Sequence, residues 1–346
     1  MRYSRVTVEA IGYELAPVVV TSSEIEARLA PLYKALRLPA GQLEALTGIR
    51  ERRWWEPGYE LSQGALAAAR KALTSAGIEA HEIGALIYAS VCRENFEPAT
   101  ACRVAAGLGV APGCAVYDIS NACLGALNGM LDLANRIELG QIRAGLVVTC
   151  ETARPIVEAT IERLAREPGM EAFKTSLATL TGGSGAAAVL LTDGSFRNAK
   201  RPRLLGGVTQ AAPEHHALCR WGVQGTPGAL VETMYTDSVA VLRHGVELGL
   251  RTWKAFLSEL AWSAEKVDKV ICHQVGSGHQ LAILKSIGIA PEKDFVTYPY
   301  LGNIGTVSLP LTAALAEERE VLRPGERVGF LGIGSGLNCL MLGLEW

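Results

Sequence analysis

The stretch Tyr117-Asp-Ile-Ser-Asn-Ala-Cys-Leu-Gly125 indicates the class of fold, because an apolar strand ends in it and a helix begins in it. We expect the strand at Ala115–Ile119 and the helix at Leu124–Glu138, with Cys123 in the first turn of that helix. On both sides of this stretch, short β-branched runs alternate with longer helical runs. This alternation is typical of an α/β fold.

The same order of elements occurs a second time along the chain. In the first half we expect the strands Ala85–Ser90, Ala115–Ile119 and Leu146–Thr149 with the helix Leu124–Glu138. In the second half we expect the strands Lys269–Cys272, Phe295–Thr297 and Val328–Leu331 with the helix Leu309–Leu322. Matching elements are about 180 residues apart, which favours two similar half-domains over chance alignment of α/β elements. We place these halves at residues 1–195 and 196–346.

Part of the chain does not repeat and is expected to form an inserted helical and loop region at about 152–185. Within it, Thr152–Lys174 reads as an amphipathic helix with Pro168-Gly169 closing a turn, and a glycine run then leads into the strand Ala186–Leu191. The segment Gly207–Gly228 contains several Gly and Pro residues and is expected to be a long loop, such as a lid or tunnel wall. Helices near Thr236–Leu260 lead into the second half.

The composition excludes several functional classes. The chain of 346 residues has 33 basic and 35 acidic residues, so its net charge is −2. This charge provides no positive electrostatic field to attract nucleic acid or an anionic membrane. With 49% hydrophobic and 20% charged residues, the chain is a packed globular protein. No apolar run approaches the roughly 18 residues of a membrane span, and Met1–Arg5 has no apolar segment behind it. We therefore expect a cytoplasmic protein without an integral membrane segment.

The eight cysteines show no C-x-x-C pair and no Cys/His cluster at metal-ligand spacing. We expect reduced thiols and no metal site. Cys123 differs from the others because the N–H groups at the start of a helix stabilise an anion and should lower the pKa of its thiol. It is therefore a candidate nucleophile, and the alternative is a buried structural cysteine.

Two further polar residues follow the ends of strands. His273 comes directly after the apolar strand Lys269–Cys272 and precedes a glycine loop, where α/β folds place functional groups. His279 competes with it, and the alternative for His273 is a hydrogen-bonded structural histidine. Asn303 lies between Gly302 and Ile304-Gly305, so it is either a turn residue or an amide held rigidly toward a developing oxyanion.

The run Gly332-Ile-Gly-Ser-Gly336 is not a dinucleotide-binding motif. It comes about ten residues before the end of the chain, which leaves no room for the helix and second strand of such a unit. We expect these glycines to bring backbone N–H groups close to a substrate carbonyl.

Together, Cys123, His273, Asn303 and the closing glycine run resemble the thiolase superfamily in its ketoacyl synthase III branch, and Thr47–Arg52 adds an N-terminal marker. The resemblance implies a five-layered αβαβα fold of two similar half-domains and a homodimer. It implies that Cys123 takes the acyl group from a thioester. His273 and Asn303 would polarise the carbonyl of the second thioester. The N–H groups of Cys123 and Gly336 would form the other oxyanion hole.

Within this branch, the enzymes that start fatty-acid synthesis carry a Trp and an Arg that help to bind coenzyme A. This chain has Gln42 and Leu46 at the matching positions, so the resemblance does not identify its coenzyme A-binding residues. They also have an aromatic residue where this chain has Glu97. A carboxylate there resembles the enzymes that join two fatty acyl-CoA molecules head to head in olefin biosynthesis. The resemblance implies that Glu97 is a base reaching the partner subunit's active site; local sequence alone favours a solvated loop glutamate. The run Gly276-Ser-Gly278 departs from the bulkier, basic residues of the family.

The resulting hypothesis is a non-decarboxylative Claisen condensation of two long-chain acyl-CoA molecules to a 2-alkyl-3-ketoacyl-CoA through an acyl-cysteine. No cofactor is expected beyond the coenzyme A thioester substrates, and downstream pathway enzymes are further candidate partners. The alternatives are decarboxylative condensation with a malonyl donor, acyl transfer to an oxygen or nitrogen nucleophile, and a catalytically silent partner subunit. The sequence does not specify acyl chain length, saturation, or coenzyme A against a carrier protein.

Overall fold

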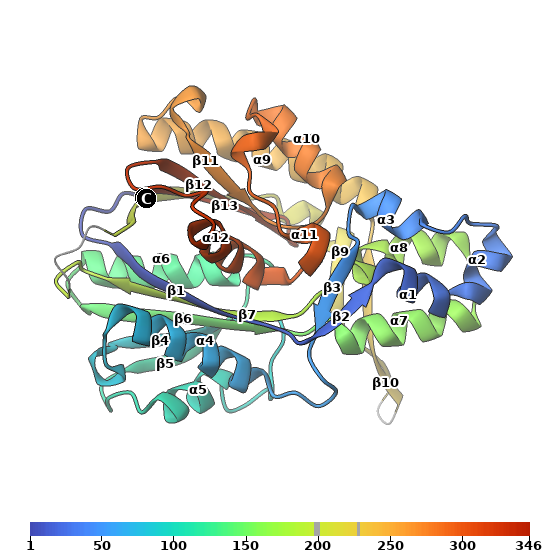
Figure 1. The fold of residues 1–346 in the computed structure, drawn as a ribbon, viewed down its shortest axis with the longest axis horizontal. Helices are drawn as coiled ribbons and strands as arrows, with labels where there is room; N and C mark the ends of the chain where they lie inside the picture. The colour runs from blue at the N-terminus through green and yellow to red at the C-terminus, as the bar shows by residue number, and fades with distance from the viewer. Residues whose placement is uncertain (197–200, 227–228) are drawn as a thin grey trace.

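The computed structural model describes residues 1–196, 201–226 and 229–346, and these residues form five stacked layers (Figure 1). Nine of their strands are hydrogen-bonded in the order β11-β12-β13-β8-β1-β7-β6-β4-β5. The β1 and β8 strands share a single pair of facing residues, Thr7 and Arg203, so the sheet divides there into two leaves. The predicted boundary between the halves lies beside residues 197–200, which are outside the described residues.

Four strands of each leaf have the same order and directions, and the first leaf has β5 as a fifth strand. The first leaf contains β1 (Thr7–Leu15), β7 (Gly185–Thr192), β6 (Ala144–Glu151), β4 (Ala85–Ala89) and β5 (Ala115–Ile119). The second contains β8 (Arg203–Ala211), β13 (Asn338–Glu345), β12 (Arg327–Gly334) and β11 (Lys269–Cys272). In each leaf the first three strands are antiparallel and the next pair is parallel.

Helices fill the space between the leaves and cover their outer faces (Figure 1). The middle layer is α6 (Gly125–Glu138) and α12 (Ser308–Glu318), whose Met130 and Leu309 are buried in one core with residues of both leaves. The outer helices are α4 (Leu61–Ala76) and α5 (Thr100–Leu108) on the first leaf and α9 (Ser238–Leu260) and α10 (Ser277–Ile287) on the second. This arrangement is the expected thiolase-like αβαβα fold.

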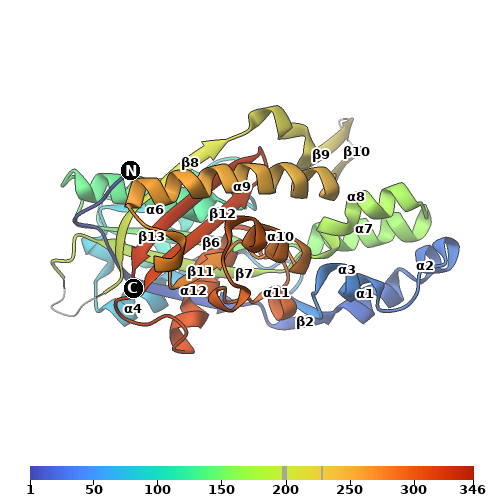
Figure 2. The same cartoon turned by 90° about the horizontal axis from the view of Figure 1, so that it is seen from above.

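A group of helices projects from one end of the layers (Figure 2). It contains α1 (Ser22–Arg28), α2 (Ala30–Leu36), α3 (Gln42–Thr47), α7 (Arg154–Arg166) and α8 (Met170–Leu180), beside the short sheet of β2 (Val18–Thr21) and β3 (Glu51–Trp54). We call these the lateral helices. The turn expected at Pro168-Gly169 separates α7 from α8, so the helical stretch expected at Thr152–Lys174 consists of α7 and the start of α8. Proline cannot continue the hydrogen-bond ladder and favours an extended preceding residue, which is why α7 ends before it.

Two expectations about elements are wrong. The long loop expected at Gly207–Gly228 consists of most of β8, the 3-10 turn η2 (Pro213–Leu218) and β9 (Cys219–Thr226), which forms a hairpin with β10 (Ala229–Thr236). Pro227 and Gly228 themselves lie outside the described residues. In β8 the glycines allow close approach, since a Cβ at Gly207 would lie 2.5 Å from the carbonyl oxygen of Met341 on β13. The glycines that predicted a loop here therefore lie in a closely packed strand.

The strand expected at Phe295–Thr297 is replaced by one isolated parallel bridge between Val270 and Asp294. Short elements complete the described chain: η1 (Ala80–Glu82), η3 (Ala264–Lys266), η4 (Pro291–Lys293), α11 (Tyr298–Leu301) and η5 (Gly305–Val307). Within the described residues, none of the helices combines the length and the apolar character that crossing a bilayer requires.

Candidate active site

Two cavities meet at Cys123. The first cavity extends from Cys123 between α9, α10 and the second leaf, and its wall is mostly aliphatic. The second cavity extends from Cys123 toward α7, α8 and the β9–β10 hairpin. Six residues line both cavities: Cys123, Ala178, Cys219, Met234, Asn303 and Ser335. A reacting group at this junction is accessible from both sides.

A strained turn places Cys123 at the junction. The β5 strand ends at Ile119, and α6 begins at Gly125 after a turn closed by the Leu124 N–H, which donates to the Asn121 carbonyl at 2.9 Å. Ala122, directly before the cysteine, has φ of 46°, a left-handed conformation that costs free energy for a residue with a side chain. Such strain at the residue before a reactive group is typical of functional sites.

The expected lowering of the Cys123 pKa is wrong for this structure. Burial raises the pKa of the thiol to about 12, and the charges of Cys219 and Glu151 act in the same direction. The helix begins two residues after the cysteine, so desolvation dominates over the helix N-terminus. The cysteine is therefore a neutral thiol at rest, and acyl transfer requires a proton acceptor in the same cavity.

His273 lies in the first cavity at the end of β11, as the sequence predicts. Burial lowers the pKa of its imidazole to about 4, with a smaller contribution from His279. Its backbone N–H donates to Leu331 O at 3.0 Å, whereas its buried Nδ1 has no hydrogen-bond partner in the described part of the chain. A neutral imidazole with an unpartnered nitrogen is chemically able to accept a proton from a thiol.

Asn303 reaches both cavities because its loop is bound to the glycine run that follows α8. The Asn303 N–H donates to Thr181 O at 2.9 Å, and the Gly183 N–H donates to Asn303 O at 2.9 Å. A Cβ at Gly183 would collide with the carbonyl oxygen of Leu301, so the close approach requires glycine there. The Asn303 Oδ1 accepts the Gly305 N–H at 3.1 Å, which leaves the side-chain NH2 group as the free donor.

The closing glycine run also reaches the first cavity. Gly332, Gly334 and Ser335 line its wall, and a Cβ on Gly334 would lie 3.4 Å from the backbone nitrogen of Cys123. Gly336 is not among the lining residues. The turn therefore packs against the backbone of the cysteine, while an oxyanion role for the Gly336 N–H stays a prediction.

Glu97 does not line the active-site cavities of its own chain. It lies in the segment 91–99 between β4 and α5, is exposed, and lines neither cavity. Phe96, beside it, has a relative accessibility of 102%, so the tip of this segment projects fully from the chain. Its predicted role in a partner subunit's site stays a prediction.

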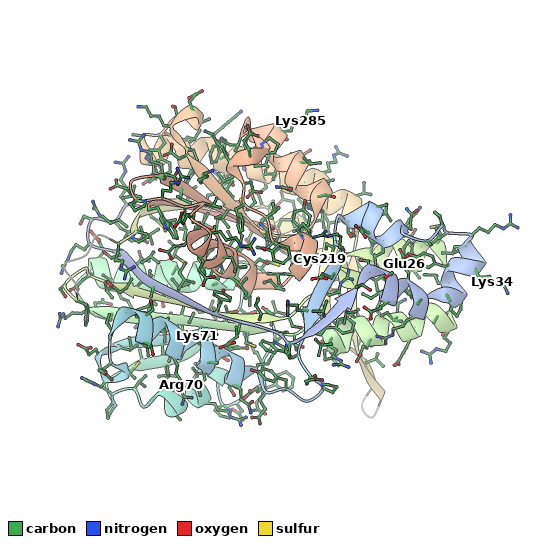
Figure 3. All side chains as sticks on the ribbon, viewed as in Figure 1. Glu26, Lys34, Arg70, Lys71, Cys219 and Lys285 are labelled. Carbon is green, nitrogen blue, oxygen red and sulfur yellow. The ribbon has the colours of Figure 1, made fainter. Side chains whose placement is uncertain are left out.

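Sequence reasoning missed two residues that line the cavities. Glu151, at the end of β6, lines the second cavity and is only 4% exposed, and burial raises the pKa of its carboxyl group. Cys219 lies on β9, between the stacked layers and the lateral helices (Figure 3). The position of Glu151 at a strand end is a signal that the sequence offers, whereas Cys219 lies in a segment whose sequence predicts a loop. The competing His279 also lines the first cavity, and burial lowers the pKa of its imidazole.

The described residues contain no group of three His, Cys, Asp or Glu side chains that could hold a metal ion. A cysteine on a strained turn and an amide donor lie at the junction of the two cavities, and a neutral histidine lines the first cavity, inside a five-layered fold. This fold and site define a thiolase-like condensing acyltransferase of the ketoacyl synthase III type.

Comparisons with known proteins specify the family. The C-terminal family model of 3-oxoacyl-(acyl-carrier-protein) synthase III matches residues 257–346. An acyl-CoA:acyl-CoA alkyltransferase of Shewanella oneidensis is 58% identical over 100% of both chains. A β-ketoacyl-(acyl-carrier-protein) synthase III of Rhodospirillum rubrum is 29% identical over 84% of this chain and 86% of its own.

Solved structures of Xanthomonas campestris OleA are similar over the whole chain. The cerulenin-bound form has a TM-score of 0.94 and 39% identity, covering 100% of this chain and 98% of that one. A variant with bound lauric acid and lauroyl-CoA has a TM-score of 0.93 and 38% identity, covering 99% and 100%. The chain belongs to the acyl-CoA:acyl-CoA alkyltransferase family.

Proposed function

We propose that this enzyme joins two fatty acyl-CoA molecules by a non-decarboxylative Claisen condensation, giving a 2-alkyl-3-ketoacyl-CoA. The observation that carries the proposal is the pair of cavities that share Cys123 and Asn303. One nucleophile then serves two acyl chains, each with its own apolar wall. The relatives support this reaction, since those most similar are named acyl-CoA:acyl-CoA alkyltransferases and one OleA structure contains lauroyl-CoA.

The side chains divide the reaction into two steps. In acylation, His273 accepts the thiol proton of Cys123 while the sulfur attacks the thioester, and coenzyme A leaves. In condensation, Asn303 and His273 donate hydrogen bonds to the enolate oxygen of the second thioester. The backbone N–H groups of Cys123 and Gly336 stabilise the oxyanion on the acyl-cysteine. These roles need no cofactor beyond the coenzyme A thioester substrates.

The second step needs a base, because a proton α to a thioester is only weakly acidic. We assign this role to Glu97 of the other copy in a homodimer. Its segment projects from the chain, and the neighbouring β5 is an edge strand with half-buried side chains, a template for pairing with a second copy. In solved OleA variants, the altered glutamate and cysteine are separated by the same number of positions as Glu97 and Cys123.

The remaining expectations belong to the same proposal. Residues 1–195 and 196–346 are its two halves, with the lateral insertion at about 152–185, and the enzyme acts in the cytoplasm on long-chain acyl-CoA. Decarboxylative condensation with a malonyl donor is the second candidate, favoured by the family model that covers the C-terminal residues. Acyl transfer to an oxygen or nitrogen nucleophile leaves the second acyl cavity without a use. A silent subunit has no need of a cysteine, a histidine and an amide that line these cavities.

The deciding experiment supplies one long-chain acyl-CoA without any malonyl donor and measures the mass of the product. Wild-type enzyme should give the condensed product and free coenzyme A. Glu97→Gln should still form the acyl-enzyme but lose condensation, whereas the exposed control Glu292→Gln should behave as wild type. Product that forms only when malonyl-CoA is added, with release of CO₂, would establish the second candidate instead.

A further inference from the structure

The segment 91–99 is fixed at its base and free at its tip. At its C-terminal end, the Asp118 carboxylate of β5 accepts the N–H groups of Thr100 and Ala101, both at 2.9 Å. In its middle, the Glu94 carboxylate accepts the Ser62 N–H at 2.7 Å. The tip at 95–98 is exposed, so its position depends on these anchors.

Glu151 is the anchor at the N-terminal end. Its two carboxylate oxygens accept the N–H groups of Val91 at 2.9 Å and Cys92 at 3.1 Å. The salt bridges of the described residues do not include Glu151. Its burial is offset by hydrogen bonds from these backbone N–H groups and from the side chains of Cys92 and Ser90. Burying a carboxylate without a cation is costly, which points to a use for the charge.

The same carboxylate also lies against the loop of the oxyanion donor. A Cβ placed on Gly305 would lie 3.4 Å from a Glu151 oxygen, and the Gly305 N–H is the one that orients Asn303. Glu151 therefore contacts two segments at once. One ends in Glu97, and the other holds the amide of its own active site.

From this geometry we propose that Glu151 is a positioning residue, which holds the segment 91–99 so that Glu97 meets the donor α-carbon in the partner subunit. The inference rests on the proposed function of Glu97. A glutamine at position 151 has one acceptor oxygen instead of two, so it can bind only one of the two N–H groups and leaves the other unpaired. Charge-assisted bonds are also stronger than the neutral bond that replaces them.

Mixed dimers separate this role from a role in the cavity of Glu151 itself. A Glu97→Gln subunit paired with a Cys123→Ala subunit has one complete site, with Cys123 from the first subunit and Glu97 from the second. We add Glu151→Gln to either subunit in turn and measure condensation and acyl-enzyme formation. On the subunit that supplies Glu97, it should reduce condensation at least about tenfold more than on the subunit that supplies Cys123.

Equal losses in the two arrangements would show a merely structural role, and a larger loss on the Cys123-supplying subunit would show a role in its own cavity. Either result overturns the proposal. If the parent mixed dimer makes no product while wild type does, Glu97 does not act across the interface and both proposals fall together.

A second measurement does not depend on activity. In the Glu151→Gln homodimer, deuterium uptake at 91–99 should rise, while uptake in α5, anchored by Asp118, stays as in wild type. Glu151→Asp keeps the charge on a shorter side chain, so its condensation rate should lie between those of wild type and Glu151→Gln. This variant provides the test if Glu151→Gln folds poorly. Unchanged uptake at 91–99 would contradict the anchor role.

Discussion

Gly182→Ala tests how the glycine run after α8 controls the oxyanion donor. Gly182 forms a β-bridge with Asn303, and its carbonyl accepts the Trp54 indole N–H at 3.1 Å. An added Cβ would lie 2.7 Å from Ala153 Cβ and 3.1 Å from the carbonyl oxygen of Thr179. Both neighbours are rigid, so neither can rotate away.

The size of the effect follows from these distances. Carbon atoms in contact are optimally about 3.5–4.0 Å apart, so the run must move by about 1 Å, and the bonded Asn303 loop moves with it. A misplacement of about 1 Å costs about 10²-fold in rate, and overpacking costs about 1–3 kcal/mol of stability. Condensation should therefore fall about 100-fold while acylation of Cys123 changes much less.

The assay compares burst release of coenzyme A, which reports acylation, with the rate of condensed product. Gly169→Ala is the matched control, because a Cβ there has its nearest neighbour at 3.9 Å. Thermal unfolding identifies loss caused by misfolding. If Gly182→Ala condenses acyl-CoA within about twofold of the control, the Asn303 loop does not depend on this run and the reasoning fails.

Three other predictions concern the catalytic groups. Asn303→Ala should slow condensation by about 10²–10³ and leave the acylation burst intact, and an equal fall in the burst would contradict the division of roles. Because burial raises the pKa of Cys123, brief iodoacetamide treatment should label the exposed Cys102 first, and peptide mapping should find that acyl-CoA protects only Cys123. Burial lowers the His273 pKa to about 4, so the unfolded chain takes up a proton that the folded protein excludes as the pH falls below about 6.5. Urea unfolding should show that stability decreases from about pH 6.5 to about pH 4, and that His273→Gln reduces this decrease; an identical pH profile for the variant would refute the buried neutral imidazole.

The candidate polar groups differ in the strength of the local pattern that points to them. Cys123 and His273 stand where an apolar strand gives way to a turn. Their strands, β5 and β11, are the two end strands of the sheet, one in each leaf, so only the stacking of the leaves brings the two residues near each other. Asn303 between glycines had only a weak signal, and the resemblance to a family of condensing enzymes supplied its role. The pKa of Cys123 was not predictable in this way, since it depends on burial and on Cys219 and Glu151, which are distant in the sequence.

The sequence by itself determined the fold class and the repeat of strand and helix order, and it selected Cys123, His273 and Asn303 as candidates for the site. These depend on periodicity and on residues adjacent in the chain. The tertiary structure alone decided that Gly207 belongs to a strand, that Glu151 anchors the segment of Glu97, and that two cavities meet at one sulfur. The physical reason is that the close approach of two strands, the burial of a charge and the shape of a cavity depend on residues distant in the sequence. A local sequence pattern does not predict such contacts.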